Sequence, residues 1–485
     1  MKSTESTWIK VLSDAEIEKI NEQSLQLLGT TGIMVDHEEG LKVLEKAGAR
    51  VDHQARRARI SRELVAECLK TVPDHFTLAA RDPKKDCPLV RGGRPYSRNG
   101  GGADFTLDLD TGEFRPLLLA DLRGYYKLMD ALDGIDFIAP VFGQDMPVAG
   151  RDILMLREAF SGTSKNIHLR AFSGKTLKIM FEMAAIVAGG KAELKKRPLV
   201  SLLEAPVSPL KFLDVMVDAL FLCGEYGIPL DVCVMPIAGG TGPVTMAGNV
   251  QLLNTEFLGG VVISQLAHPG APLQYAARPM AMDMRTGFSL AGAVELGMMA
   301  VAGAQMAHFY NVPVSLHGPW TDSMLHDGQS TFERTYMTLM AAYAGANVLV
   351  GAGMMQQSLV TSHEQMVIDS EINKTVIRAL QGFEVDEGRL AMEAIARVGP
   401  GGNFVQDPHT MKYLRGERYK PSPLIYRGSR DGWMEDGGKS FEKRANDIAR
   451  TLLKEHEVLP LPEDVAQSLD ELVADAMKQF TSSHS

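Results

Sequence analysis

The sequence has few cysteines, and their spacing argues against two common uses of the thiol. The 485 residues include only Cys68, Cys87, Cys223 and Cys233, with no CxxC or CxH pattern. Structural zinc sites and disulfide frameworks depend on close, repeated cysteine spacing. We therefore expect four reduced, buried thiols in a cytoplasmic protein that binds no metal ion of its own.

A surplus of basic charge is also missing, as are long hydrophobic runs. The chain has 50 Lys and Arg against 60 Asp and Glu, which gives a formal net charge of −10. Proteins usually bind nucleic acids and anionic membrane surfaces through basic patches, and this chain has no surplus of basic residues. Neither is therefore an expected partner. No apolar run reaches membrane-spanning length without polar breaks, and the N-terminal stretch lacks the apolar core of a signal peptide.

Aromatic residues are scarce, and three of them are tryptophans. One of these, Trp320, lies in the polar segment HGPWTDSMLHDGQ at 317–329, directly after an apolar run. An indole in that place is a candidate wall for a flat or cationic ligand. His317 and His326, with Asp322 between them, are residue types that bind metal ions, but no third ligand at helical spacing supports a metal site.

What the chain does contain, from about residue 117 onward, is a regular alternation of short β-rich runs and helical segments. Helices are predicted at 212–226, 249–266, 290–310, 331–344 and 364–380, and strands at 137–142, 167–172, 199–203, 230–234, 273–277, 312–316, 348–351 and, more weakly, 402–405. Eight strands, each followed by a helix, predict an α/β fold of the (β/α)8 barrel type. A doubly wound open sheet is the competitor, but it usually has fewer repeats or a phosphate loop near its start.

The segments on either side of the barrel have a different pattern. Residues 1–116 predict helices capped by Ser13 and Ser61, followed by a small β layer. The barrel is expected over 117–410, and residues 411–485 are expected to form a C-terminal extension with helices.

Polar residues follow the predicted strands, where a barrel enzyme places its active site. These candidates are Asp145, Glu204, Arg278, Arg285, His317, Trp320, Asp322, Gln356 and Gln357. Tyr96 precedes the glycine-rich stretch of Asn99, Gly100 and Gly101, which could bring backbone close to a ligand or form a hairpin turn. Asp322 could instead cap the helix that follows it. From the residues alone, the prediction is a barrel enzyme with a polar mouth and an unknown reaction.

Several motifs along the chain resemble those of the trimethylamine methyltransferase family. They include TGIMVD at 31–36, AGARVD at 47–52, ARDP at 80–83, NGGGAD at 99–104, TGPVTMAGN at 241–249, NTEFLG at 254–259, HPGAP at 268–272, DMRTG at 283–287, YAGANVLVGAGM at 343–354 and VGPGGNF at 398–404. The resemblance spans nearly the whole chain. It implies a barrel enzyme that moves a methyl group from a methylated amine to the Co(I) corrinoid, a cobalamin, of a separate carrier protein.

Founding archaeal members of that family use pyrrolysine, whereas this chain contains only the standard twenty residues. It is therefore similar to the non-pyrrolysine branch, whose members demethylate quaternary amines such as glycine betaine, proline betaine or carnitine. On this basis the resemblance implies a set of roles. Trp320 and Tyr96 wall the methylammonium; Glu204, Asp145 and Asp322 position it; His317 and Arg285 grip a substrate carboxylate; Gln356, Gln357, Asn99, Gly100 and Gly101 face the corrinoid.

Two other functions remain open at this stage. One is a lyase or hydrolase that uses the same barrel on a small cationic substrate, and the other is a non-catalytic member that binds the amine. The resemblance also favours a homo-oligomer.

Overall fold

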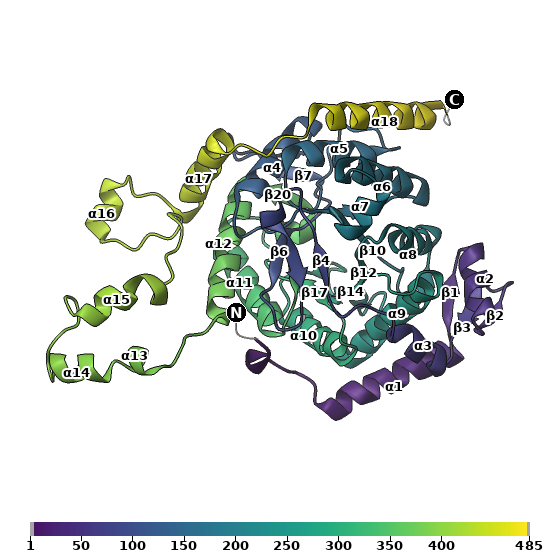
Figure 1. The fold of residues 1–485 in the computed structure, drawn as a ribbon, viewed down its shortest axis with the longest axis horizontal. Coiled ribbons are helices and arrows are strands. Elements are labelled where there is room, and N and C mark those ends of the chain that lie inside the picture. Colours follow the sequence, from purple (N-terminus) through teal and green to yellow (C-terminus); the bar gives the residue numbers. More distant parts are fainter. Residues whose placement is uncertain (1–3, 483–485) are drawn as a thin grey trace.

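A closed barrel of parallel strands lies at the centre of the computed structural model, which describes residues 4–482 (Figure 1). Its hydrogen-bonded sheet runs in the order β6 (Tyr96–Asn99), β18 (Val348–Ala352), β17 (Val314–His317), β14 (Leu273–Ala277), β12 (Leu230–Val234), β10 (Val200–Glu204) and β9 (Ile167–Arg170). Parallel bridges from Arg98 to Phe137 and from Ile138 to Ile167 insert residues 137–138 between β6 and β9, which closes the ring. The predicted (β/α)8 fold is confirmed.

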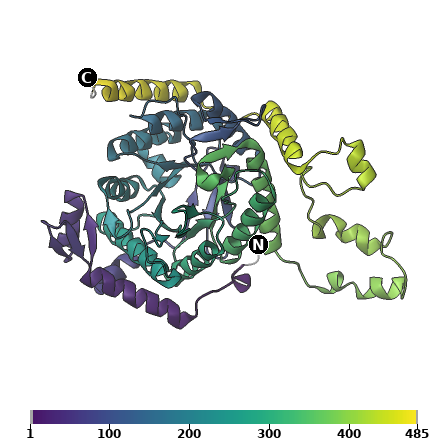
Figure 2. The same ribbon diagram turned by 180° about the vertical axis from the view of Figure 1, so that it is seen from behind.

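A ring of helices surrounds the strands, and it is clearest from behind (Figure 2). Its members are α4 (Leu119–Ala131), α5 (Arg151–Gly162), α6 (Gly174–Ala188), α8 (Asp214–Tyr226), α9 (Met246–Ala267), α10 (Val294–Phe309), α11 (Gly328–Tyr343) and α12 (His363–Leu380). The five helices predicted from periodicity are confirmed within a few residues at each end. None of the helices in the described part of the chain combines the length and apolar character that crossing a bilayer requires.

The first strand of the barrel differs from the prediction. Residues 402–405, expected to form the eighth strand, have no strand structure. Instead β6 pairs with β18 and is followed by α4, so the barrel begins about 40 residues earlier, before the boundary expected at residue 117. The run YSRN that forms β6 is polar, and only closure of the ring against β18 and Phe137 makes it a buried strand.

An N-terminal layer covers α9. Helix α1 (Asp14–Thr30) begins with a capping box between Ser13 and Glu16, and α3 (Arg62–Leu69) is capped by Ser61, as the sequence predicts. With α2 (Glu38–Lys46) and a small sheet of β1 (Ile33–Val35), β2 (Arg50–Asp52), β3 (Arg57–Arg59) and β11 (Lys211–Phe212), they pack on the outside of the ring. Because α1 and α3 lie on its outer side, α9 is buried on nearly every face.

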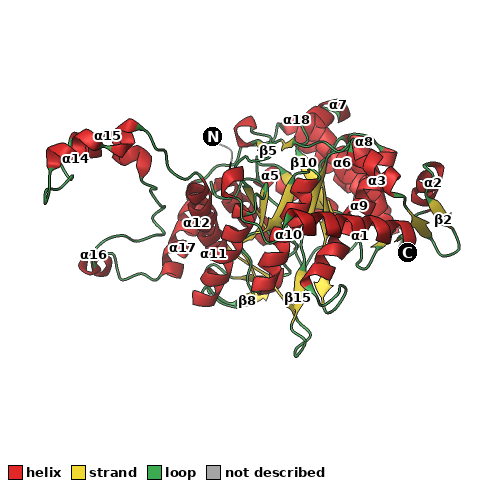
Figure 3. Ribbon diagram, turned by 90° about the horizontal axis from the view of Figure 1, so that it is seen from below, coloured by secondary structure: helices red, strands yellow, loops and turns green. Residues whose placement is uncertain are grey.

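The two ends of the barrel are built differently (Figure 3). Strands β4 (Phe76–Leu78) and β5 (Cys87–Leu89) lie at the end where the barrel strands begin, and their side chains fill that end together with Tyr96, Phe137 and Val348. At the carboxyl ends, two small sheets surround the opening. One is formed by β13 (Ile237–Ala238), β15 (Met280–Met282) and β16 (Ser289–Leu290), and the other by β7 (Phe105–Leu107), β8 (Phe114–Pro116), β19 (Met354–Met355) and β20 (Val360–Ser362).

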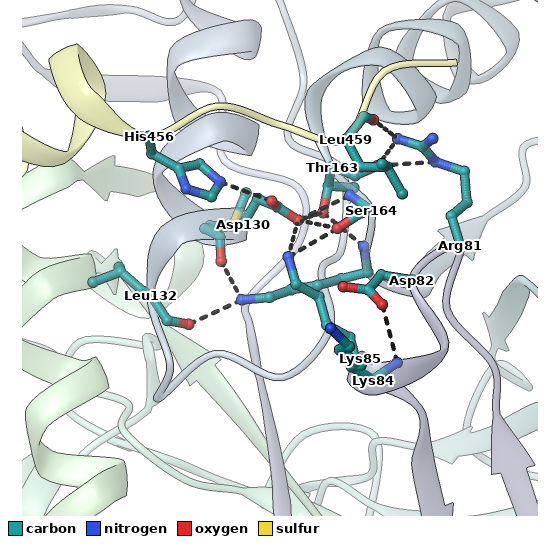
Figure 4. A network of polar contacts seen from close by, with 12 residues as sticks. Arg81, Asp82, Lys84, Lys85, Asp130, Leu132, Thr163, Ser164, His456 and Leu459 are labelled. Carbon is teal, nitrogen blue, oxygen red and sulfur yellow. Dashed lines mark hydrogen bonds and ion pairs between the residues drawn. The ribbon is translucent and has the colours of Figure 1, made fainter. Parts of the chain in front are cut away.

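Asp130 anchors the C-terminal tail to the closed end of the barrel (Figure 4). Its buried carboxylate accepts hydrogen bonds from Lys85 Nζ at 3.0 Å, Ser164 N at 2.8 Å and His456 Nε2 at 2.8 Å. Arg81 adds hydrogen bonds to the carbonyls of Thr163 and Leu459. These contacts join four separate parts of the chain, and they fix the start of α18 (Glu463–Ser482) beside α5 and α6.

Residues 381–440 form an arm that projects away from the barrel (Figures 1 and 3). The arm leaves the end of α12 and returns to α17 (Phe441–Glu455), which packs on α12. It contains the short helices α13 (Glu387–Leu390), α14 (Met392–Val398), α15 (Pro408–Glu417) and α16 (Arg430–Glu435). Large apolar side chains that are more than half exposed occur along it: Phe383, Val385, Leu390, Met392, Ile395, Val405, Met411 and Met434.

Candidate active site

A cavity of about 1000 Å³ opens at the carboxyl ends of the barrel strands. Residues of β6, β9, β10, β12, β17 and β18 line it, together with Arg278 directly after β14, and the loops after the strands form its walls. This volume is at the upper end of the range typical of small-molecule sites, roughly 300 to 1,000 Å³. The position is the one in which (β/α)8 enzymes carry out their chemistry.

The floor of the cavity holds two buried guanidinium groups. Arg98 on β6 and Arg278 after β14 are 3% and 2% exposed. Asp231 is the carboxylate beside them; its Oδ2 lies 3.9 Å from Arg278 Nη2 and 3.6 Å from His168 Nε2. Burial, and next the nearby Arg278, lower the pKa of Arg98 to about 10, so its guanidinium group remains charged at neutral pH. Burial also lowers the pKa of Arg278.

His317 and Trp320 form a stacked pair in the cavity wall. Their ring centroids are 3.8 Å apart with an interplanar angle of 19°. Burial lowers the pKa of His317 well below its usual value, and Arg278 and Arg98 lower it further, so the imidazole is neutral. The indole Nε1 donates a hydrogen bond to Ser358 Oγ at 2.9 Å, which fixes the plane of the ring. Both residues line the cavity where the sequence analysis placed them.

The rim beside this pair is a tight loop in an unusual conformation. Gln356, Gln357 and Ser358 have consecutive positive φ angles of 47°, 59° and 81°. Such angles are unfavourable for residues other than glycine, and the surrounding structure must hold them in place. Here the backbone N–H groups of Gln356 and Gln357 donate to the carbonyls of Ser323 and Thr321. Both glutamines line the cavity, so the loop presents two side-chain amides at its mouth.

The three carboxylates predicted to position the amine occupy three different environments. Asp322 lines the cavity, but both of its oxygens accept hydrogen bonds from backbone, the N–H groups of Ala291 and Gly292, each at 2.8 Å. Asp145 is exposed, lies outside the cavity lining and accepts a hydrogen bond from Leu119 N at the start of α4.

Glu204 is buried at the end of β10. The residue before it, Leu203, lines the cavity, and neighbouring side chains of a strand point to opposite faces. The side chain of Glu204 therefore belongs to the opposite face of the strand. Burial raises the pKa of Glu204 to about 7. Neither Glu204 nor Asp145 lines the cavity, so the structure does not place either carboxylate where it was predicted to contact the amine.

Tyr96 and Arg285 are also displaced from their predicted roles. Tyr96 shares a strand face with Arg98 but lies two residues earlier, at the closed end of the barrel, where it packs with Phe137 and Val348. Arg285 sits in the exposed turn between β15 and β16, with its side chain 88% exposed and paired to Asp283 at 3.2 Å. Neither residue lines the cavity. A residue of the site must lie at the carboxyl end of a strand, and Tyr96 lies at the other end. Its side chain must also point into the cavity, and that of Arg285 points into solvent.

The glycine-rich stretch after β6 lines the cavity with backbone. Gly100 and Gly101 are part of the wall, and a Cβ on Gly100 would lie 2.3 Å from Met354 Cγ, so no side chain fits there. Asn99 is fully buried instead, and its amide bonds to both the N–H and the carbonyl of Ala139 at 2.7 Å. Asn99 thus joins β6 to residues 137–138 rather than facing a ligand.

Sequence reasoning missed Arg98, His168, Arg170 and Asp231, all of which come from within strands rather than from loops. The available signal was their alternation with apolar residues, as in IHLR and LDVCV. In a barrel strand every second side chain points inward, so charged residues in such a run indicate a polar interior. Among residues 4–482, no group of three or more His, Cys, Asp or Glu side chains is arranged to hold a metal ion.

Comparison with known proteins matches nearly the whole chain to one family. The profile of the family "Trimethylamine methyltransferase (MTTB)" matches residues 2–481. The trimethylamine methyltransferase MttB of Desulfitobacterium hafniense strain DCB-2 is 32% identical over 470 residues, which cover 96% of this chain and 94% of that protein. The glycine betaine methyltransferase of D. hafniense strain Y51 is 32% identical over 433 residues, 88% of each chain.

Among solved structures, the monomethylamine methyltransferase MtmB of Methanosarcina barkeri overlaps 92% of this chain and 93% of its own, with 13% sequence identity and a TM-score of 0.49.

Proposed function

The chain belongs to the trimethylamine methyltransferase family, and from that membership we propose that it moves a methyl group from a quaternary amine to the Co(I) corrinoid of a partner protein. The observation that carries the proposal is the indole of Trp320, stacked on a neutral imidazole in the wall of the barrel cavity. Aromatic faces attract methylammonium cations by about 0.5 to 2 kcal/mol each. The relative named glycine betaine methyltransferase supports a quaternary amine as the methyl donor.

The reaction requires no acid or base from the protein. In a quaternary amine the N–CH₃ bond breaks with both electrons on nitrogen, so a neutral tertiary amine leaves and no proton moves. The corrinoid supplies the cobalt nucleophile that receives the methyl group. The neutral state of His317 suits this chemistry, because the residue adds no positive charge beside the amine. The protein contributes position and the exclusion of water from the cation.

The mouth of the cavity has features that suit a protein-bound corrinoid. Exposed apolar side chains line it, among them Phe288, Met324 and Leu359, and such patches mark protein interaction sites. The amides of Gln356 and Gln357 at the rim can exchange hydrogen bonds with the amide side chains of a corrin ring. The cavity is also larger than a small amine fills, which leaves room for a second reactant.

The proposal predicts that the protein consumes Co(I) only when a suitable amine is present. Reduced cobalamin is mixed with the protein and, separately, with glycine betaine, proline betaine, carnitine or trimethylamine, and the visible absorption of Co(I) is followed. We expect one quaternary amine to abolish the Co(I) absorption with release of its tertiary amine, and no change when protein is omitted.

Two results would count against the proposal. Conversion of an amine without cobalamin would indicate a lyase or hydrolase. Tight binding of an amine that leaves Co(I) unchanged, even with a corrinoid protein encoded nearby, would indicate a non-catalytic binding protein.

We further propose that the chain self-associates through the arm of residues 381–440. Its short helices would be unstable alone. Its apolar side chains expose more hydrophobic surface to water than is usual for a surface without a partner. Residues 408–430 carry six Lys and Arg against one Glu in a chain whose net charge is −10. A second copy of this chain carries a net negative charge that complements the basic arm and is always present, whereas a transient partner would leave the arm exposed between encounters.

Self-association predicts a solution mass that is a multiple of 52.9 kDa. Placing charges in the arm with Phe383→Glu and Met392→Glu together is expected to reduce the mass to that of one chain, measured by size-exclusion chromatography with light scattering. As the control, Met284→Glu introduces the same charge at another exposed apolar site, on the turn after β15, and should leave the mass unchanged. A wild-type mass of 52.9 kDa would refute the idea.

A cytoplasmic location is part of the same proposal. All four cysteines are free and buried, as expected for a reducing compartment.

A further inference from the structure

The floor of the cavity carries more buried positive charge than the protein neutralises. Arg98 and Arg278 are nearly fully buried, and Asp231 is the carboxylate that lies against them. Burial lowers the pKa of both His168 and His317 well below the usual value, so neither histidine adds charge. Asp231 supplies one carboxylate against two guanidinium groups; burial raises its pKa, while Arg278 and Arg98 lower it.

Arg98 is the less satisfied of the two arginines. Within residues 4–482 its hydrogen bond runs from Nη1 to the carbonyl of its neighbour Asn99, at 2.9 Å, and its Nε has no partner. Arg278, in contrast, donates from Nη1 to the carbonyl of Ser315 at 2.5 Å and from Nη2 to Ser315 Oγ at 2.6 Å. Arg98 thus resembles a group held ready for a ligand, because a buried guanidinium has five N–H donors to satisfy.

The cavity contains further unpaired polar atoms beside Arg98. Both ring nitrogens of His317 are buried without a hydrogen-bond partner among the described residues, as is His168 Nε2. All three residues line the same cavity. Arg170 also lines it, which adds a third cationic side chain. The acidic residues of the lining are Asp152 and Asp322, and both already accept hydrogen bonds from backbone N–H groups.

We infer that this floor binds a carboxylate of the substrate, held by Arg98 with Arg278 behind it. The inference rests on the proposed function, in which Trp320 holds the ammonium group. A carboxylate would supply the missing negative charge and accept two parallel hydrogen bonds from the fork of Arg98. The substrate class is then a zwitterion, a quaternary amine that carries a carboxylate, rather than choline or trimethylamine. Arg98 takes the role that the sequence analysis gave to Arg285.

Binding is measured by isothermal titration calorimetry, which needs no cobalt. The ligands are glycine betaine and γ-butyrobetaine, which carry carboxylates at two distances from nitrogen, and choline, which carries none. We expect one of the two betaines to bind at least roughly tenfold more tightly than choline, since hydrogen bonds to charged groups contribute about 1.5 to 3 kcal/mol. Choline binding as tightly as both betaines would overturn the inference.

Arg98→Met tests the residue, because methionine keeps an apolar stem without the charge. It is expected to weaken betaine binding by about tenfold or more while choline binding changes little, and Arg98→Lys should restore part of the loss. The control is Arg285→Met, which removes an exposed arginine and should alter neither ligand. Equal losses for betaine and choline in Arg98→Met would indicate a purely structural role and refute the assignment. If Arg98→Met does not fold, Arg98→Lys must still weaken betaine binding selectively.

This experiment separates the inference from the proposed function. A clear preference for betaines with no effect on Co(I) would refute methyl transfer alone. Methyl transfer from choline at the same rate as from betaines would refute the carboxylate site alone.

Discussion

Replacing Trp320 with alanine is expected to lower kcat/KM for methyl transfer from the quaternary amine by roughly 10- to 100-fold. The substitution removes the aromatic face that lines the cavity, the stacking partner of His317 and the donor to Ser358. The cation interaction contributes about 0.5 to 2 kcal/mol, and a lost hydrogen bond adds about 1 kcal/mol. The measurement is initial rates of Co(I) consumption across a range of amine concentrations.

Two variants control for this effect. Trp320→Phe keeps an aromatic face and loses only the hydrogen bond to Ser358, so we expect it to retain most of the activity. Trp433→Ala removes a tryptophan from the arm, far along the chain from the cavity lining, and should leave kcat/KM unchanged. Methyl transfer and affinity that are unaltered in Trp320→Ala would contradict the role of the indole.

Changing Asp369 to asparagine is expected to lower the free energy of unfolding by about 3 to 5 kcal/mol. Asp369 and Arg334 are completely buried, with Oδ2 and Nη1 2.6 Å apart. The substitution leaves the guanidinium buried without a counter-charge, which is far more costly than losing an exposed ion pair. Urea unfolding followed by circular dichroism should show the change as a lower midpoint.

The effect should also reach the active site. Arg334 donates hydrogen bonds to the carbonyls of Pro319 and Met354, and Asp369 accepts one from Gly353 N at 2.7 Å. Pro319 precedes Trp320, and Met354 precedes the loop of Gln356 and Gln357, so the ion pair positions both walls of the cavity. We therefore expect slower methyl transfer at temperatures where Asp369→Asn is still folded.

Asp447→Asn is the matched control. It removes the partner of Lys443 in an exposed i, i+4 pair on α17, where the two side chains are 35% and 56% exposed. Such pairs contribute at most about 1 kcal/mol. Equal shifts of the unfolding midpoint in the two variants would show that burial of the Arg334 pair does not matter.

Secondary structure was the part of the fold that local sequence predicted best. The five helices follow from apolar periodicity, and the caps at Ser13 and Ser61 from residue type. Strands such as β12 and β14 were recognisable because both of their faces are buried and all but one residue of each, Asp231 and Gln274, are apolar. β6 lacked that signature, since a polar strand becomes buried only when the ring closes around it.

The positions of the site residues were predicted less well, for a geometric reason. The loop after β17 was identified correctly, and it places His317 and Trp320 in the cavity. Glu204 and Arg285 were chosen because they follow strands, but that rule does not say whether a side chain points inward. Only strand pairing fixes which alternate residues face the interior.

The sequence by itself determined the architecture and the family of this protein, because periodicity, capping and motifs are local or are carried along the whole chain. The tertiary structure decided which side chains meet. Arg98, His168 and Asp231 lie on three strands and Arg278 directly follows a fourth, spread over 180 residues of sequence, and register and closure of the barrel bring them together. The charge at the floor of the cavity also depends on the tertiary structure. Burial away from water lowers the pKa of His317, and it raises the free-energy cost of leaving the Arg98 guanidinium without a partner.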